Sequence, residues 1–99
     1  MAYIVVATLK FPTTEDREKA LPVFQAHRSR CLANEPGTSQ FDLCFPEKED
    51  DTLLIYEAYD DLDAFNTHSD GESMKQVLVD LNDLKLELSA TVRSGLRLD

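Results

Sequence analysis

The sequence has few of the residues that would assign it to several large functional classes. It contains only two cysteines, two histidines and three glycines among its 99 residues. Two cysteines are too few for a disulfide framework, and Cys31 and Cys44 are too far apart for a CxxC redox or zinc motif. We therefore expect a reducing, cytoplasmic setting in which both thiols serve as small apolar side chains.

Basic residues and long apolar runs are also scarce. Lysine and arginine number 10 against 19 aspartates and glutamates, which gives a net charge of −9. A negative charge of this size repels nucleic acids and anionic membrane surfaces, so we expect neither as a partner. No stretch approaches the ~20 apolar residues of a membrane span. The apolar run at the N-terminus lacks the basic region and cleavage site of a signal peptide, and it is typical of a strand.

Common motifs for catalysis and nucleotide binding are absent as well. The sequence contains no GxGxxG, P-loop or GxSxG motif, and its two histidines are not at the spacing of metal ligands. The acidic loop 46–51 lacks the glycine and the terminal glutamate of a calcium loop. We therefore expect no metal and no cofactor.

Strand patterns occur in four segments of what we interpret as one domain, residues 1–99. Segments 3–11 and 52–59 have apolar side chains in both alternating sets, as expected for strands that are covered on both faces. Segment 38–45 alternates between apolar and mixed side chains, and segment 84–98 alternates most regularly of all.

Helical patterns separate these strands. A threonine cap and an acidic first turn predict a helix from residue 13 or 14 to about 34, which Glu-Pro-Gly at 35–37 ends. Pro22 predicts either a kink just before it or two helical pieces. Apolar spacings of three and four predict two more helical segments, 61–68 and 74–81, which together form one bent layer.

The resulting order, β-α-β-β-α-β, predicts an α+β, ferredoxin-like fold: a four-stranded antiparallel sheet with helices on one face. Two helical layers cover only one face of such a sheet, whereas segments 3–11 and 52–59 are apolar on both faces. A second copy of the chain is the simplest cover, because closed two-fold homodimers are the commonest oligomers. We therefore expect a homodimer that packs sheet against sheet.

The stretch 53–68 contains the best candidates for chemistry. Glu57 places a charge in an otherwise apolar strand, and the helix that follows the strand ends at His68. Glu57 and Tyr59 share one strand face, which we assign to a small-molecule cavity under the helices, whereas Tyr56 faces the dimer partner. Histidine as a residue type is the usual general base near neutral pH, so His68 is the candidate base, with Glu57 orienting it or acting as a base itself.

Each candidate also has a purely structural interpretation. His68 can instead be a helix-end histidine that is hydrogen-bonded to the backbone or to Glu57, and Glu57 can instead pair with Arg93 or Lys85. Arg93 is a candidate for binding an anionic substrate group, and it is equally typical of a salt bridge on a strand face. The expected cavity walls are Phe24, His27, Phe41 and Phe65. Of these, His27 is expected to point its ring tip into solvent, and each phenylalanine is equally typical of plain core.

Several short motifs occur together in this order: EPG at 35–37, FDL at 41–43, YEAY at 56–59, DD at 60–61, Ala64-Phe65 and His68. Over nearly its whole length the chain resembles the antibiotic biosynthesis monooxygenase family of dimeric α/β-barrel proteins. The YEAY and FDL runs look most like the branch that holds quinol monooxygenases and the isomerase of phosphorylated autoinducer-2.

The resemblance implies a cofactor-independent monooxygenase that acts on a small aromatic quinol or enol, with His68, Glu57 and Tyr59 as catalytic residues. It leaves open an isomerase of a small phosphorylated hydroxy-dione and a non-catalytic ligand-binding domain. Family members that degrade haem carry an asparagine and a tryptophan where this chain has Ala7 and His68, so haem degradation is disfavoured. Tyr59 stands where many oxygenase members have a tryptophan, which leaves an aromatic wall but weakens any tryptophan-dependent mechanism.

Overall fold

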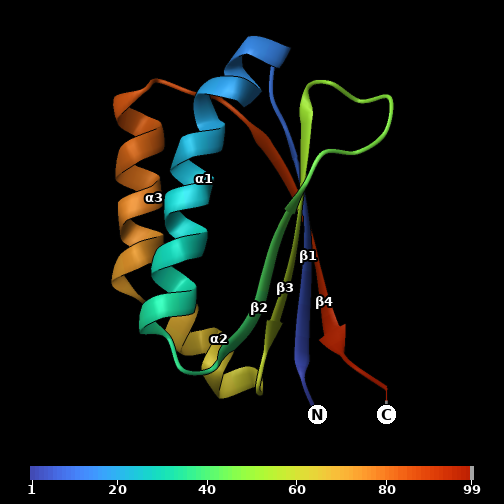
Figure 1. Cartoon of the computed structure of the whole chain (residues 1–99), viewed down its shortest axis with the longest axis vertical. Helices are drawn as coiled ribbons and strands as arrows, with labels where there is room; N and C mark the ends of the chain where they lie inside the picture. The colour runs from blue at the N-terminus through green and yellow to red at the C-terminus, as the bar shows by residue number, and fades with distance from the viewer. Residues whose placement is uncertain (99) are drawn as a thin grey trace.

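In the computed structural model, which describes residues 1–98, helices cover one face of a four-stranded sheet (Figure 1). The elements in chain order are β1 (Tyr3–Lys10), α1 (Thr14–Asn34), β2 (Thr38–Cys44), β3 (Thr52–Tyr59), α2 (Leu62–Ser69), α3 (Glu72–Asp83) and β4 (Ser89–Leu96). The strand order is β2-β3-β1-β4 and all pairings are antiparallel. The predicted ferredoxin-like fold is confirmed, with α2 and α3 as the second helical layer. Asp99, the last residue of the predicted domain, lies outside the described residues.

Side-chain caps determine where the first two helices begin. The hydroxyl of Thr13 accepts a hydrogen bond from the backbone N–H of Asp16 at 3.0 Å, and Asp61 accepts one from the N–H of Ala64 at 2.8 Å. Helix α1 continues through Pro22, so the alternative of two helical pieces is wrong. A proline removes a single helical hydrogen bond, and the exposed position of Pro22 leaves room for its ring.

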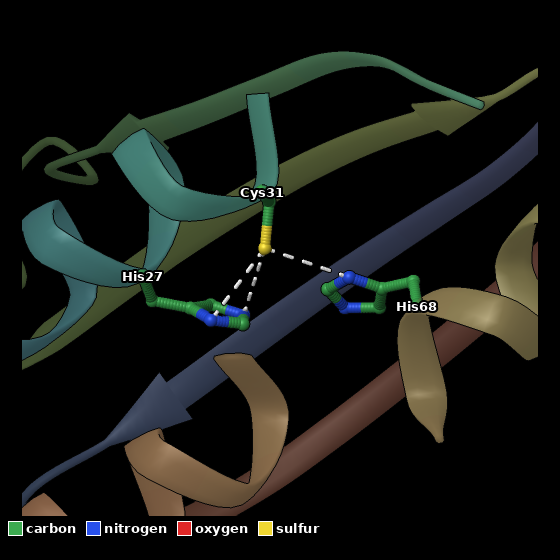
Figure 2. Close-up of side chains that lie close together, drawn as sticks. All are labelled: His27, Cys31 and His68. Atoms are coloured by element: carbon green, nitrogen blue, oxygen red, sulfur yellow. Dashed lines mark hydrogen bonds between the residues drawn. The ribbon is translucent and has the colours of Figure 1, made fainter. Parts of the chain in front are cut away.

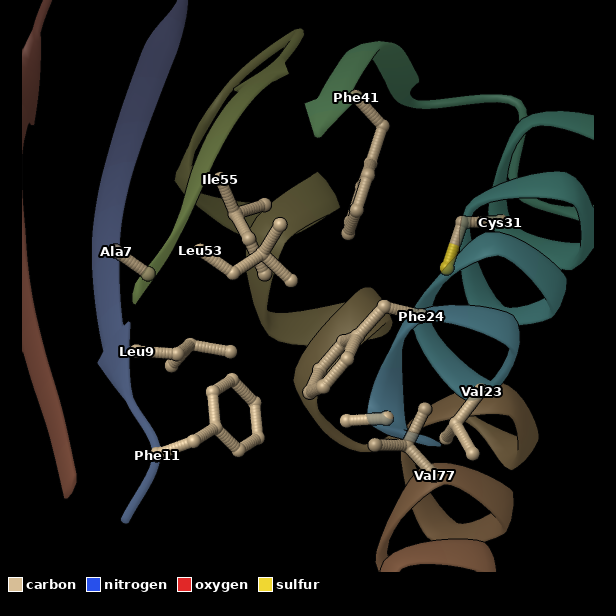
Figure 3. Packing of buried hydrophobic residues seen from close by; sticks show 11 residues of the cluster. Ala7, Leu9, Phe11, Val23, Phe24, Cys31, Phe41, Leu53, Ile55 and Val77 are labelled. Carbon is tan, nitrogen blue, oxygen red and sulfur yellow. The ribbon is translucent and has the colours of Figure 1, made fainter. Parts of the chain in front are cut away.

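The hydrophobic core lies between the inner face of the sheet and helices α1 and α3 (Figure 3). Strands β1 and β3 contribute alternate side chains to it, because successive strand residues point to opposite faces. The core residues are Ala7, Leu9, Phe11, Ala20, Val23, Phe24, Cys31, Phe41, Leu53, Ile55 and Val77. Each large apolar side chain buried here stabilises the fold by about 1.5–3 kcal/mol, which fixes the helical layer over the sheet.

The last strand is shorter than predicted, since β4 begins at Ser89 and not at residue 84. Helix α3 extends to Asp83, and the following Lys85 adopts a left-handed backbone with φ of 54° that no strand residue has. Leu86 and Leu88 pack against the core from the connecting segment. Their burial explains the apolar alternation that imitated a longer strand.

The second face of the sheet is not covered by any helix among residues 1–98 (Figure 1). Val6 pairs with Tyr56 and Arg93 on this face and is 43% exposed, while Ile4 and Leu54 are half-buried. The two central strands are therefore apolar on both faces, as the sequence indicates, although the helices cover one face only.

Two further expectations concern the cysteines and the membrane. Both cysteines are free, and Cys31 is fully buried, but Cys44 is exposed at the end of edge strand β2. The prediction that both thiols fill apolar space is therefore wrong for Cys44. No helix in the described part of the chain combines the length and apolar character that crossing a bilayer requires.

Candidate active site

A cavity of about 340 Å³ lies between the inner face of the sheet and the helical layer. Most of its lining is apolar and comes from all three helices and from strands β1 to β4. The four predicted wall residues, Phe24, His27, Phe41 and Phe65, all line it. Leu78 on α3 and Val92 on β4 also line the cavity, yet they are 62% and 58% exposed, so they form its mouth.

Glu57 provides a carboxyl group in this apolar wall. It pairs with Val5 on β1 and Phe41 on β2, and all three side chains point toward the helices. Burial raises the pKa of the Glu57 carboxyl above its ordinary value, although a hydrogen bond from Tyr59 and the charge of His68 oppose this shift. Glu57 is therefore poised to exchange a proton nearer neutral pH than an exposed glutamate would.

Tyr59 lies behind the cavity wall. Its side chain is completely buried, and its hydroxyl donates a hydrogen bond to Oε1 of Glu57. Burial, followed by the negative charge of Glu57, raises the pKa of the Tyr59 hydroxyl above its ordinary value. Tyr59 thus remains a neutral phenol that positions Glu57, and it is not among the residues that line the cavity.

His68, in the last turn of α2, lines the cavity and is 1% exposed. Its Nδ1 atom lies 2.8 Å from Oε1 of Glu35, and Thr38 donates a hydrogen bond of 2.8 Å to the same oxygen. Because a carboxylate only accepts, Nδ1 carries the proton of the imidazole. The lone pair is then on Nε2, which is 3.7 Å from Oε1 of Glu57. Because Glu35 accepts the proton of Nδ1, His68 has an unprotonated Nε2 atom next to Glu57 that can act as a base.

Cys31 lies between the two histidine rings (Figure 2). Its Sγ atom is 3.6 Å from Nδ1 of His68 and 3.6 Å from Nδ1 of His27. Burial, reinforced by the negative charge of Glu35, raises the pKa of the Cys31 thiol to about 12. The thiol is therefore protonated at neutral pH, and alone it is a poor nucleophile.

His27 is buried, so the prediction that its ring tip lies in solvent is wrong. The Nδ1 atom is 2.8 Å from the hydroxyl of Ser73, and the ring makes an edge contact with Phe41. Burial, followed by the positive charges of His68 and Arg30, lowers the pKa of His27 to about 4. His27 is thus a neutral imidazole in the wall of the cavity.

Arg93 is not near this cavity. It pairs with Val6, whose side chain lies on the sheet face away from the helices, and it is exposed. The prediction that Arg93 binds substrate in the cavity is therefore not supported. An ion pair with Glu57 is excluded as well, because Arg93 and Glu57 lie on opposite faces of the sheet. Lys85 lies in the exposed segment after α3, so it does not fill that role either.

Sequence reasoning missed three polar residues that contact the histidines: Cys31, Glu35 and Ser73. Only Glu35 carries a local signal, because a carboxylate at the C-terminal end of a helix is disfavoured by the helix dipole unless something compensates it.

The fold also brings donor atoms of His27, Cys31 and His68 within 4.8 Å of one another. A thiol and two imidazoles form a donor set that suits transition metals, and the expectation of no metal site did not anticipate it.

Comparison with solved structures places this fold among known ones. A Caulobacter crescentus protein named for antibiotic biosynthesis monooxygenases superposes with a TM-score of 0.88 at 21% identity, over 99% of this chain and 91% of that chain. SnoaB from Streptomyces nogalater, a cofactor-independent oxygenase, superposes in a single-site variant with a TM-score of 0.79 at 14% identity, over 99% and 94% of the two chains. At these identities the likeness shows a shared fold.

Sequence comparison gives a more specific result. Among curated proteins, none matches this sequence. The family described as antibiotic biosynthesis monooxygenase matches residues 2–78, which include β1 to β3, α1, α2 and every polar residue around His68. Because this match spans most of the sequence, the chain belongs to the antibiotic biosynthesis monooxygenase family.

Proposed function

We propose that this protein is a cofactor-independent monooxygenase that acts on a small aromatic quinol or enol. The observation that carries the proposal is the free Nε2 position of His68 beside Glu57 in the wall of an otherwise apolar cavity. A cavity of about 150 Å³ is enough to bind benzene. The volume of about 340 Å³ therefore suits a substrate of one or two aromatic rings.

Proton transfer is the first step of the proposed reaction. An acidic O–H or C–H of the bound substrate gives its proton to Nε2 of His68, and the carboxylate of Glu35 stabilises the imidazolium through Nδ1. Glu57, held by Tyr59, accepts or returns a proton on the same side of the substrate. The apolar walls exclude water, so the substrate anion is not reprotonated from solvent.

Dioxygen is the second reactant. The substrate carbanion adds to dioxygen and forms a hydroperoxide after it takes up one proton. A base then removes the remaining hydrogen of the same carbon and the O–O bond breaks with loss of water, which leaves a carbonyl, so one oxygen atom enters the product and the other leaves as water. The substrate supplies all four electrons that reduce dioxygen, and in this scheme the protein supplies the base, the acid and the dry surroundings.

The alternative isomerase requires a binding site for the phosphate of its substrate. No arginine or lysine lines the cavity in the described part of the chain, and Arg93 points to the opposite face. A phosphorylated dione is therefore a poor fit, and the oxygenase proposal is favoured over it.

We also propose that the protein acts as a homodimer in the cytoplasm. The uncovered apolar face around Val6, Leu54 and Tyr56 supports a sheet-to-sheet partner, since closed two-fold pairing buries the same patch on both copies. The two free cysteines fit a reducing compartment.

Turnover of a panel of quinols and enols, with and without dioxygen, tests the proposed reaction. We expect consumption of one dioxygen per substrate in air and no product under nitrogen. His68→Gln is expected to lower kcat about 10²–10⁴-fold, the usual contribution of a positioned general base. Asn66→Ala, at an exposed position on the same helix, is the matched control and should keep full activity.

Two outcomes would contradict the proposal. Substrate consumption that is indifferent to dioxygen, with solvent deuterium entering the substrate, would identify an isomerase. Saturable binding of the panel with no turnover by the folded protein would identify a ligand-binding domain.

A further inference from the structure

Helix α1 places His27 and Cys31 one turn apart, and the end of α2 brings His68 to the same point (Figure 2). We infer that these three side chains form a binding site for a divalent transition metal ion of the zinc type, with two imidazole nitrogens and one thiolate as ligands. His68 is also the base of the proposed oxygenase reaction, but that reaction uses no metal ion and neither His27 nor Cys31, so the inference goes beyond that function.

The spacing of the donor atoms fits tetrahedral coordination. Zinc binds sulfur at about 2.3 Å and histidine nitrogen at about 2.0–2.1 Å, so a tetrahedron separates the two atoms by about 3.6 Å. The Sγ atom of Cys31 is 3.6 Å from Nδ1 of His68 and 3.8 Å from Nε2 of His27. All three donor atoms lie within 4.8 Å of one another, so an approach of the two rings toward each other closes the site around an ion.

Each histidine also has an outer partner for its second nitrogen. When Nε2 of His27 binds the ion, Nδ1 donates its proton to the hydroxyl of Ser73 at 2.8 Å. When Nδ1 of His68 binds the ion, Nε2 carries the proton and faces Glu57 at 3.7 Å. An outer hydrogen-bond acceptor such as Ser73 fixes the ring orientation in known metal sites.

Charge also favours a cation. Glu35 and Glu57 both contact His68, and with a Cys31 thiolate they offset the charge of a divalent ion. Oε1 of Glu35 is already 2.8 Å from Nδ1 of His68, so it is well placed to take the fourth coordination position. An outer cleft of about 430 Å³ is lined by Glu35 and Ser73, which contact the two histidines, together with Arg30 and Glu72.

An ion at this site would change His68. It replaces the Nδ1 proton that Glu35 accepts and leaves Nε2 protonated, so metal occupancy and proton abstraction by His68 exclude each other. The binding measurement below does not involve turnover. Its outcome is therefore independent of whether the proposed oxygenase activity is found.

Cobalt is a suitable probe because tetrahedral Co²⁺ has intense visible bands and a thiolate ligand adds a near-ultraviolet charge-transfer band. The titration uses the Cys44→Ser protein after reduction and treatment with a chelator. This substitution removes the exposed thiol, which would otherwise compete as a ligand. We expect one equivalent of Co²⁺ per chain to produce both sets of bands, and Zn²⁺ to abolish them by displacement, because Zn²⁺ loses no ligand-field energy in a tetrahedral site of thiolate and imidazole ligands.

Variants then assign the ligands. Cys31→Ser should abolish the charge-transfer band, and Ser73→Ala should weaken Co²⁺ binding about 10- to 100-fold through loss of the outer hydrogen bond. Ser29→Ala, an exposed serine on α1, should bind as tightly as the parent. Circular dichroism checks that each variant is folded. Absence of both bands in the folded Cys44→Ser protein, or a charge-transfer band that survives Cys31→Ser, overturns the inference.

Discussion

Nδ1 of His68 lies 2.8 Å from Oε1 of Glu35, and this contact joins the C-terminal end of α2 to the C-terminal end of α1. A negative charge is unfavourable at a helix C-terminus, and the hydrogen bond from Nδ1–H of His68 compensates for the position of Glu35. The contact also fixes which nitrogen of His68 faces the cavity.

Replacement of Glu35 by glutamine tests the role of this contact. A charge-assisted hydrogen bond is worth about 1.5–3 kcal/mol, so we expect Glu35→Gln to lower kcat for quinol oxidation about 10- to 100-fold. KM should not change, because Glu35 is not among the cavity-lining residues. Steady-state kinetics with Glu72→Gln as the control, a carboxylate in the same outer cleft, measures both constants. A raised KM with unchanged kcat would contradict the positioning role.

Gly37 allows the close approach of α2 to the turn after α1. A Cβ atom at Gly37 would lie 2.5 Å from the Cβ of Ala64, whereas one at Gly95 meets nothing within 4 Å. We therefore expect Gly37→Ala to destabilise the fold by about 1–3 kcal/mol, as overpacking does, and Gly95→Ala to have no such effect. Urea denaturation of both variants measures the difference. Equal stability of the two would show that α2 shifts without cost.

His27 predicts a pH dependence of stability. Burial lowers its pKa from 6.5 to about 4, so between these values the unfolded chain binds more protons and stability falls as the pH falls. The effect amounts to about 3 kcal/mol at most, at 1.36 kcal/mol per pKa unit. The raised pKa of Glu57 has the opposite effect: at pH values above the ordinary pKa of glutamate, it makes stability rise as the pH falls. The wild type is therefore compared with His27→Gln, because both proteins contain Glu57.

Denaturation in the presence of a chelator, at several pH values from 7 to 4, gives this comparison. The wild type should lose more stability than His27→Gln as the pH falls, because only the wild type must protonate or expose the buried imidazole of His27. An equal loss of stability in the two proteins as the pH falls would mean that His27 keeps an ordinary pKa.

The mouth of the cavity offers a test of ligand binding that does not depend on activity. Leu78 and Val79 are adjacent and exposed on α3, but only Leu78 lines the cavity. Leu78→Trp should narrow the mouth and weaken the binding of 2-naphthol about tenfold, equivalent to about 1.4 kcal/mol, whereas Val79→Trp should not. Titration followed by naphthol fluorescence measures both affinities. Equal weakening in the two variants would place the binding site elsewhere.

The uncovered sheet face predicts the oligomeric state. In light scattering, the wild type should have about twice the chain mass of 11.2 kDa. Val6→Lys places a charge on the apolar face and should yield monomers, while Val79→Lys on α3 should not. A wild-type protein that is monomeric at micromolar concentration would rule out the proposed dimer.

Most of the fold was predictable because its signals are local. Alternation of apolar side chains identified all four strands, and threonine and aspartate caps marked the starts of α1 and α2. The start of β4 was predicted too early for two reasons. The left-handed backbone of Lys85 has no sequence signal, and Leu86 and Leu88 continue the apolar alternation of the strand although they lie in the loop before it. Boundaries that depend on what a side chain packs against are not visible in the sequence.

The candidate site was predictable only in part. The sequence placed Glu57 and Tyr59 on one strand face, and it identified His68 and all four expected wall residues, because residue type and strand period suffice for that. It assigned Arg93 as a possible substrate ligand, although its own alternation put that residue on the polar face, away from the cavity.

The order of the elements and the side chains that share a face follow from local sequence patterns, since alternation, helical spacing and capping act between near neighbours. The meeting of Glu35, Cys31 and His27 with His68 depends on packing between distant segments, because these groups lie on α1 and α2 and the packing of Ala64 against Gly37 brings those helix ends together. Contacts between distant segments depend on the whole fold, and the contact of His68 with Glu35 determines which ring nitrogen of His68 carries the proton.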